Sequence, residues 1–456
     1  MAEGFYWRHE SDHECVPNQS GLYCRHSQVQ CEQASVEICI VMNCLGYGPE
    51  IRQARRDAQK ECDRLMTAEW QGNMAVITTG SKAEGLTRVL ESDTDKMCVL
   101  PDIMCIEDCV NSDTLSRETT VFTLSTKVCY HGHCRLILKR LGKIIPAYIY
   151  NALCDDGNGL PLLCTDLFVT LGPTHNHMPH VVRHERAGPS LPSSIDDCLH
   201  IDLVNCLPCH CPSILKRWAE RSRHWPPPAT VQKVVSLGAY VTPVGFKGSE
   251  YIHVEWRICF NTGENELVSS LNNILVYIYV LLKMVVKDIL KPVKKEITSY
   301  TVKNIVMWIA ENNPQHVFLE KSLFYWLNEG LQELRTAIIT KHLPYYMIPE
   351  RNLMAACVFN YEQKRTWVAT ITEMMNEGPK LILRLPKIRQ AVILYPEPMM
   401  GYSKMSVELE LLMLKLMHRY AYCTDENGVI NELDPIIQAI QTRVAEIADD
   451  ARVYLF

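Results

Sequence analysis

The sequence predicts an α+β chain of two lobes, in which a mixed β-sheet lobe with a long spine helix precedes a helical lobe. Three observations predict this fold. A strongly periodic segment at 49–66 indicates a long helix, short strand-like runs separated by Pro, Gly and Asp follow to about residue 210, and helical spacing dominates after about residue 265. A chain of 456 residues is long enough to bury a core in each lobe.

These changes of pattern divide the chain into four segments. Residues 1–47 are irregular and rich in Cys, His and polar residues, and 48–265 form the core with the sheet. Residues 266–390 form the helical lobe and 391–456 a C-terminal helical extension. Within the core, the Pro- and Gly-broken stretch at 172–194 is predicted to be a long loop.

Composition limits the function classes. The net charge of −6 provides no global basic field, so nucleic-acid binding would require a local basic patch. The first residues lack the apolar segment of a signal peptide, and the longest apolar run, 274–286, is interrupted by Lys283. We therefore expect no membrane span and a cytoplasmic location.

The chain has twenty cysteines, which could suggest a disulfide framework. They are spread over 456 residues, however, and this low density argues against one. We expect most of them to be small buried hydrophobic side chains in a reducing compartment. Two Cys and His clusters are weaker zinc candidates, because neither has two ligand pairs held well apart, and a third group, of His alone, is a further weak metal candidate. They are Cys206, Cys209, His210 and Cys211; His13, Cys15, Cys24, His26 and Cys31; and His175, His177 and His180.

The segment ITTGSKAEGLTRVLESDTDKMCV, residues 77–99, combines a Gly-Ser turn with two aspartates one residue apart. On a strand, the period of two would point Asp93 and Asp95 to the same face, within reach of a shared cation. Ion pairing or solvent exposure are the alternatives. Gly80 and Ser81 offer backbone amides and a small hydroxyl to a polyphosphate without steric obstruction.

A third acid completes this interpretation. Mg²⁺ takes oxygen ligands and keeps some for phosphate, so two or three carboxylates are expected around it. Asp202 is the best candidate, since it is a lone acid within the apolar strand pattern HIDLVNCL. Together these features suit nucleotidyl transfer with two Mg²⁺ or Mn²⁺ ions.

Six blocks resemble, in order, those of the cyclic GMP-AMP synthase and Mab family, and among its members the animal cGAS-like receptors. The blocks are GSKAEGLTRVLESDTDKM, IDLVNCLPCHCPSILKRWAERSRHWP, EWRICF, YVLLKMVVK, SYTVKNIVMW and YYMIPERNLM. The match runs from about residue 48 to 355, and the twelve positions from Ser81 to Asp93 agree with the family's interval. The resemblance implies a bilobed nucleotidyltransferase fold.

The resemblance also implies roles for individual residues. Gly80 and Ser81 correspond to the phosphate turn, and Asp93, Asp95 and Asp202 to the metal-binding triad, with Asp202 nearest the attacking ribose hydroxyl.

Four further residues carry implied contacts with nucleotide. Arg257 corresponds to an arginine that meets the linking phosphate or a base, Lys283 and Ser299 to residues at the triphosphate, and Tyr300 to a tyrosine on which a base stacks. The alternatives are a snorkelling Lys283, a core Tyr300 and an Arg257 paired with Glu255.

The predicted spine helix has a basic face, made of Arg52, Arg55, Arg56 and Lys60. Such a face is often only solvated. In the family this helix lies on the surface for the activating ligand, which implies sequence-independent phosphate contacts with double-stranded RNA. A second basic group could extend that surface: Lys216, Arg217, Arg221 and Arg223.

One departure from the family concerns zinc. Cyclic GMP-AMP synthase has a His- and Cys-rich insert that grips DNA between the blocks EWRICF and SYTVK, whereas residues 258–298 here contain only Cys259 and no His. The chain thus resembles the receptors that lack the zinc insert.

The implied function is that of an innate-immune sensor enzyme. An activating ligand would switch on the joining of two nucleoside triphosphates (ATP, GTP or others) into a cyclic dinucleotide, with release of pyrophosphate, and a STING-like receptor would read the product. The alternatives are a non-catalytic Mab-type interaction protein and a template-independent RNA nucleotidyltransferase.

Overall fold

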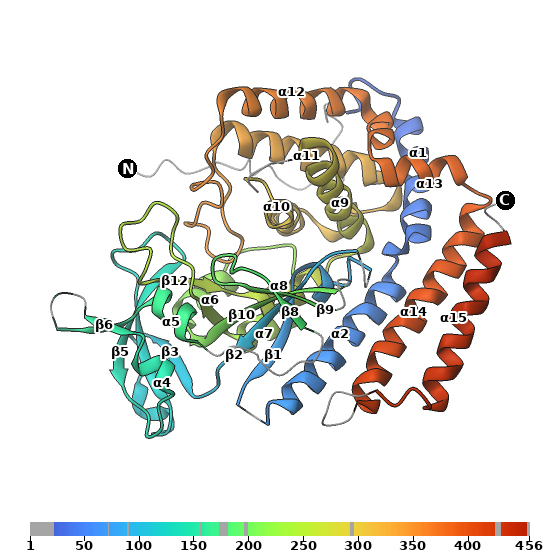
Figure 1. The fold of residues 1–456 in the computed structure, drawn as a ribbon. Coiled ribbons are helices and arrows are strands. Elements are labelled where there is room, and N and C mark those ends of the chain that lie inside the picture. Colours follow the sequence, from blue (N-terminus) through green and yellow to red (C-terminus); the bar gives the residue numbers. More distant parts are fainter. Residues whose placement is uncertain are drawn as a thin grey trace.

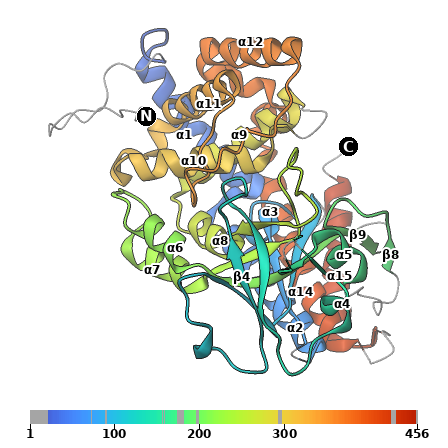
Figure 2. The same ribbon diagram turned by 90° about the vertical axis from the view of Figure 1, so that its left-hand side faces the viewer.

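The structure is a computed structural model that describes residues 22–71, 73–88, 91–155, 157, 159–172, 181–195, 199–291, 296–424 and 430–453. It confirms the predicted α+β fold. A mixed β-sheet region forms one part of the molecule, and a group of helices packs over it (Figures 1 and 2).

The strands are short apart from one. They are β1 (Ala75–Thr79), β2 (Thr94–Val99), β3 (Ile103–Glu107), β4 (Thr120–Ser125), β5 (His133–Arg140), β6 (Leu153–Asp155), β7 (Pro161–Leu163), β8 (Val181–Arg183), β9 (Leu191–Ile195), β10 (Leu199–His210), β11 (Ala239–Thr242) and β12 (Glu255–Cys259).

Strand β10 organises the sheet because its two halves have different neighbours. The first half pairs with β2 in parallel and with β9 in antiparallel orientation, and the second half pairs with β11 and β3. The order β10-β11-β12-β5-β4-β3 returns to β10 and so forms a closed ring of strands. The strands β1 and β2 extend from the first half of β10.

The helices before the helical lobe are α1 (Gln28–Met42), α2 (Pro49–Glu69), α3 (Gly80–Ala83), α4 (Ala147–Tyr150), α5 (Thr165–Leu171), α6 (Pro212–Ala219), α7 (Pro228–Leu237) and α8 (Asn261–Ser269). The later ones are α9 (Asn273–Met284), α10 (Ser299–Asn312), α11 (Leu323–Thr340), α12 (Tyr361–Glu377), α13 (Pro386–Leu394), α14 (Met399–Cys423) and α15 (Pro435–Val453). Short π and 3₁₀ segments are η1 (Asn43–Tyr47), η2 (Ser112–Thr114), η3 (Val285–Leu290), η4 (Gln315–Val317), η5 (Glu320–Ser322) and η6 (Gly378–Arg384).

Helix α2 is the predicted spine helix, and it begins with a proline at its first turn, where no backbone N–H is required. It is fastened to the sheet by Asp63, whose carboxylate accepts hydrogen bonds from the backbone and side chain of Thr78 in β1. The Lys96 ammonium of β2 lies 2.8 Å from the same carboxylate. The preceding helix, α1, packs instead against α11 in the helical lobe, so the start of the described chain spans both parts.

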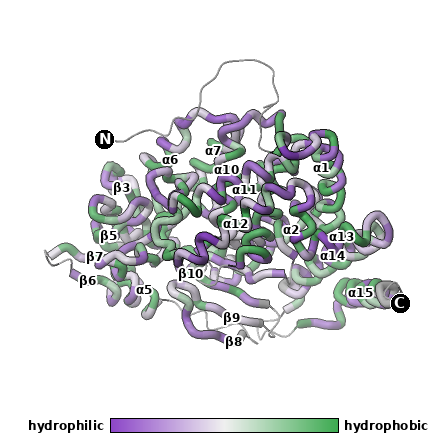
Figure 3. The backbone as a smooth tube through the Cα atoms, turned by 90° about the horizontal axis from the view of Figure 1, so that it is seen from above, coloured by the Kyte–Doolittle hydropathy of each residue, from purple (hydrophilic) through white to green (hydrophobic). Residues whose placement is uncertain are grey.

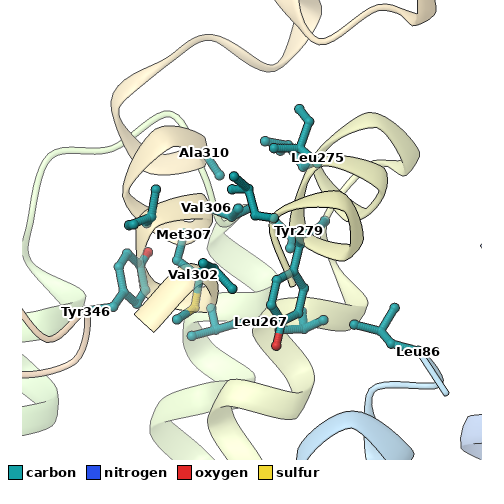
Figure 4. Close-up of a cluster of buried hydrophobic side chains, with 14 of the residues drawn as sticks. Leu86, Leu267, Leu275, Tyr279, Val302, Val306, Met307, Ala310 and Tyr346 are labelled. Atoms are coloured by element: carbon teal, nitrogen blue, oxygen red, sulfur yellow. The ribbon is translucent and has the colours of Figure 1, made fainter. Parts of the chain in front are cut away.

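One continuous apolar core joins the two parts. It includes Trp256 in β12 as well as Tyr279 and Val306 in the helical lobe, all almost fully buried. Figure 4 shows the junction, where Leu86 from the segment after α3 lies near Tyr279, and Leu267 of α8 lies near Val302 of α10. The position of the segment after Ser81 is therefore coupled to the packing of the helices.

Helices α14 and α15 form a C-terminal hairpin at the outer edge of the molecule (Figures 1 and 3). Helix α14 packs along α2, and α15 packs on α14. A buried bidentate ion pair crosses the α14–α2 contact, because Arg55 Nε and Nη2 donate to the two carboxylate oxygens of Glu410 at 2.8 and 2.6 Å. Arg55 also donates to the carbonyls of Gly46 and Gly85.

Three expectations from sequence need correction. Residues 28–42 form α1, although an irregular segment is predicted there. The predicted loop at 172–194 contains β8 and most of β9, which pair with each other. The boundary at 265 falls inside α8, because the long helical pattern that follows is divided by the Asn272 N-cap into α8 and α9.

The metal candidates among Cys and His are not supported where they can be seen. Every cysteine in the described residues is a free thiol, and Cys206, Cys209 and Cys211 are buried while His210 is exposed. Within the described ranges, no three His, Cys, Asp or Glu side chains converge to hold a metal. His13, Cys15, His175, His177 and His180 lie outside the described residues. None of the helices described has the length and apolar character needed to cross a bilayer.

The pair between Arg55 and Glu410 predicts a large stability loss when one partner is neutralised. Glu410→Gln should lower the free energy of unfolding by about 3 kcal/mol, because a buried guanidinium loses its counter-charge. Urea denaturation measures this. The matched control is Glu408→Gln in the same helix, whose pair with Arg443 lies at the surface and should contribute far less stability. Equal losses in the two variants would contradict the prediction.

Buried His133 predicts a specific acid sensitivity. Burial, and then the charges of Arg351 and Arg257, lower the pKa of His133 to about 4, and its Nδ1 has no hydrogen-bond partner. Since the folded pKa lies below the unfolded value, the unfolded state binds more protons and stability falls as pH drops from about 6.5 to about 4.

The variant His133→Gln lacks this titration. Between about pH 7 and about pH 4.5, its free energy of unfolding should fall by about 2 kcal/mol less than that of the wild type. Urea denaturation at the two pH values checks this, with His210→Gln, an exposed histidine of β10, as the control. A wild-type loss matched by His133→Gln would refute the assignment.

Candidate active site

Asp95 and Asp202 lie side by side because β2 and β10 are parallel neighbours. The two residues are register partners, and Thr79 at the end of β1 is the register partner of Asp95 on the other side. Both carboxylates line a cavity of about 290 Å³ between the sheet and the helical lobe. The hydroxyl of Ser190, just before β9, donates to Asp202 Oδ1 at 3.1 Å.

The Gly-Ser turn closes one wall of this cavity. Gly80 has a φ of +66°, which favours glycine, and a Cβ built there would lie 2.8 Å from Asp95 Oδ2. A side chain at position 80 would therefore displace the Asp95 carboxylate. Ser81 follows in the short helix α3 and also lines the cavity.

Asp93 does not join the other two acids. It is exposed, it does not line the cavity, and it precedes β2, which starts at Thr94. The period of two that would align it with Asp95 applies only within a strand. The predicted triad is therefore brought together as a pair, Asp95 and Asp202.

Lys283, at the end of α9 in the helical lobe, reaches the Gly-Ser turn. Its Nζ donates to Ser81 Oγ at 2.7 Å. Burial lowers the pKa of Lys283, and the carboxylates of Glu84 and Glu91 partly oppose this effect. A cation thus lies against the hydroxyl that is predicted to contact phosphate.

The other predicted nucleotide contacts also surround the cavity. Arg257 in β12, and Ser299 and Tyr300 at the start of α10, all line it. The Tyr300 hydroxyl donates to Glu264 Oε1 at 2.9 Å, and its ring centroid lies 5.8 Å from that of Tyr345. Glu255 accepts bonds from Phe246 N and Ser249 Oγ, so the described contacts of Glu255 do not include Arg257.

Three buried charged residues in the cavity wall are not predicted from the sequence. They are Glu84, Glu264 and Lys303, of which Lys303 forms an ion pair with each glutamate. The sequence spacing could have indicated two of them, Glu84 and Lys303. Glu84 follows Ser81 by three positions and Lys303 follows Tyr300 by three, the spacing that puts two residues on one helical face.

Two of the four cations on the basic face of α2 are buried, which corrects the predicted nucleic-acid contacts of Arg52 and Arg55. Arg52 is 4% exposed and donates to Asn273 and to the carbonyl of Gly48, and Arg55 is 3% exposed and paired with Glu410. The C-terminal hairpin covers Arg55, a contact that a local pattern cannot reveal. Arg56 is half-buried and Lys60 is exposed.

The second basic group, residues 216–223, likewise contains both exposed and packed side chains. Lys216 and Arg217 are exposed on α6. Arg221 pairs with Glu311, and Arg223 donates to the carbonyl of Trp218, so these two serve the packing of the protein.

The donor set fits a divalent cation. Mg²⁺ in nucleotide enzymes is commonly bound by one or two carboxylates, with substrate phosphates and water completing its shell. Asp95 and Asp202 supply two carboxylates beside a turn that can approach phosphate. A second ion would need the third acid.

A sheet that carries paired acids beside a Gly-Ser turn, under a helical lobe that supplies a lysine, defines a nucleotidyltransferase-type protein. Comparison with known families agrees. Residues 164–270 match the Mab-21 protein nucleotidyltransferase domain, and residues 278–372 match the Mab-21 protein HhH/H2TH-like domain. The family of these domains includes cGAS-like proteins. No curated protein matches the chain.

Lys283 predicts the strength of triphosphate binding. Lys283→Met should weaken the binding of ATP with Mg²⁺ about tenfold, because a charge-assisted hydrogen bond to phosphate contributes about 1.5–3 kcal/mol. Titration calorimetry measures the dissociation constant. Lys287→Met, an exposed lysine one turn further along, is the control and should bind as the wild type does. Equal affinities for all three proteins would remove Lys283 from the site.

Proposed function

We propose that this protein is a metal-dependent nucleotidyltransferase that joins two nucleoside triphosphates into a cyclic dinucleotide when an activating ligand binds. The observation that carries the proposal is the register of β2 and β10. It sets Asp95 beside Asp202 at the Gly80–Ser81 turn, where Lys283 meets Ser81. The likeness of the chain to cGAS-like receptors supports the specific product, which a STING-like receptor would read in the cytoplasm.

The chemistry consists of two successive phosphoryl transfers. In each, a ribose hydroxyl oxygen bonds to an α-phosphorus, the bond from that phosphorus to the bridging oxygen breaks, and pyrophosphate leaves. Asp202 accepts the hydroxyl proton, while Ser81 and Lys283 hold the triphosphate and Tyr300 orients a base. A divalent cation on Asp95 and Asp202 would neutralise charge on the phosphates.

Asp93 takes part only after a local change. It lies one residue before β2 and is exposed, so a rearrangement of the segment before that strand would be needed to bring it to the pair. We propose that nucleotide and activator together cause this rearrangement. It would add the third carboxylate, and with it the second ion.

Double-stranded RNA is the proposed activator, through contacts other than Arg52 and Arg55. Exposed cations remain at Lys60, Lys216 and Arg217, and phosphate contacts from them would be independent of sequence.

A second candidate function is that of a non-catalytic Mab-type interaction protein. One observation favours it. Asp93 stands apart from Asp95 and Asp202, and the described residues contain no group of three acids able to hold a metal. The two candidates differ in whether any nucleotide is consumed.

The test is incubation of the purified protein with all four labelled nucleoside triphosphates and Mg²⁺ or Mn²⁺, with and without double-stranded RNA or DNA. A cyclic dinucleotide identified by mass spectrometry is expected. Asp95→Asn and Asp202→Asn should each lower the rate at least about a hundredfold, because each loses a carboxylate that would hold the cation against the reacting phosphate.

The control is Asp166→Asn, an exposed acid of α5 that lies outside the cavity and should leave the rate unchanged. A linear chain of nucleotides would indicate template-independent RNA synthesis instead. No nucleotide consumption under any condition would favour the interaction protein. An Asp93→Asn variant with full activity would limit the site to two acids.

A further inference from the structure

A buried ionic cluster joins the cavity wall to both parts of the protein. Lys303 Nζ in α10 lies 3.1 Å from Glu84 Oε1 and 2.7 Å from Glu264 Oε2. The three side chains are 8% exposed or less. Glu84 follows the Ser81 turn, Glu264 lies in α8, which contacts β1 and β11 of the sheet, and Lys303 belongs to the helical lobe.

Three tyrosine hydroxyls complete the cluster. Tyr279 donates to Glu84 Oε2 at 3.2 Å, while Tyr300 and Tyr345 donate to Glu264 Oε1 at 2.9 and 2.7 Å. Both carboxylates therefore accept bonds on each of their oxygens. The Lys303 ammonium also lies 5.1 Å from the centroid of the Tyr300 ring.

The charges within the cluster are interdependent. Burial alone would lower the pKa of Lys303, but Glu264 and Glu84 outweigh it and raise that pKa well above its ordinary value. Burial would likewise raise the pKa of Glu264, but Lys303 and the tyrosine hydroxyls lower it. Lys303 and Glu264 thus stay ionised, and removal of either one leaves the other buried without its partner.

The spacing connects this cluster to two residues of the proposed site. Glu84 lies three positions after Ser81, and the Glu84 backbone N–H donates to the Gly80 carbonyl at 3.0 Å. Lys303 lies three positions after Tyr300 on α10. The cluster therefore holds the turn through Glu84 and the Tyr300 ring through Glu264.

We propose that Lys303 is a positioning residue that sets the Ser81 turn and the Tyr300 ring at the distance required by a bound nucleotide. The inference rests on the proposed function, since it assigns Lys303 a task in that same site. Lys303 acts through Ser81 and Tyr300, by fixing the helical lobe relative to the turn.

The test compares Lys303→Met with a matched structural control. Glu311→Gln lies in the same helix and is equally buried, and Glu311 bonds to Arg221 at 2.9 Å and to the Tyr346 hydroxyl at 2.6 Å, away from the cavity. Three quantities are measured on the full chain: the melting temperature, the dissociation constant for ATP with Mg²⁺, and the kcat and KM of dinucleotide synthesis.

Both variants should lose stability, but only Lys303→Met should lose function. We expect it to weaken ATP binding about tenfold and to lower kcat about a hundredfold, because displacement of oriented groups by about 1 Å has effects of that size. Glu311→Gln should stay within about twofold of the wild type in both. Lys303→Arg, which keeps the charge, should recover most of the kcat.

Other outcomes distinguish failure of the positioning role of Lys303 from failure of the proposed function. If Lys303→Met and Glu311→Gln lose activity in proportion to their loss of melting temperature, the cluster is only structural and the proposal is overturned. If the wild type makes no product, the proposed function fails. The ATP affinities of Lys303→Met and Glu311→Gln then decide whether Lys303 is a positioning residue.

A milder variant covers the case in which Lys303→Met does not fold. Tyr345→Phe removes one hydrogen bond to Glu264 and keeps the ring. It should lower kcat or ATP affinity by about threefold to tenfold, in line with the loss of one hydrogen bond to a charged group. Wild-type values for both quantities in a folded Tyr345→Phe protein would overturn the proposal.

Discussion

The parallel pairing of β2 with β10 is the constraint on which the site depends. Successive side chains of a strand point to opposite faces, so a slip of one residue would turn Asp202 away from Asp95. The register is held from several sides, because the first half of β10 lies between β2 and β9 while its second half closes a ring through β11 and β3. Neighbouring strands therefore hold β10, and with it Asp202, in place from both edges.

Around the sheet, separate groups of buried ion pairs connect different elements of the protein. Lys96 pairs with Asp63 and fastens the spine helix to the sheet, while Arg55 pairs with Glu410 and fastens the C-terminal hairpin to the spine. Lys303 joins two glutamates in the cavity wall. The cations Arg55, Lys96 and Lys303 are tolerated in the interior because each has several hydrogen-bond partners.

Prediction from the sequence succeeds where a local period determines the outcome. The spine helix, the helices of the second lobe and the strand with Asp202 all follow from spacing alone. The ordered blocks contain Ser81 and Tyr300, which line one cavity, and Lys283, which donates to Ser81. Whether β2 starts at residue 93 or 94 depends on pairing with β1 and β10, so the position of Asp93 could not be derived from its spacing to Asp95. The burial of Arg55 depends on a helix more than three hundred residues away.

The Arg55–Glu410 pair also sets an order of events during synthesis. The two residues are 355 positions apart, so at about 5–20 residues per second the ribosome needs roughly 20–70 s to make the second after the first. Until then the Arg55 guanidinium lacks its carboxylate partner. Each nascent chain therefore carries, for that interval, a cation whose charge the finished protein balances.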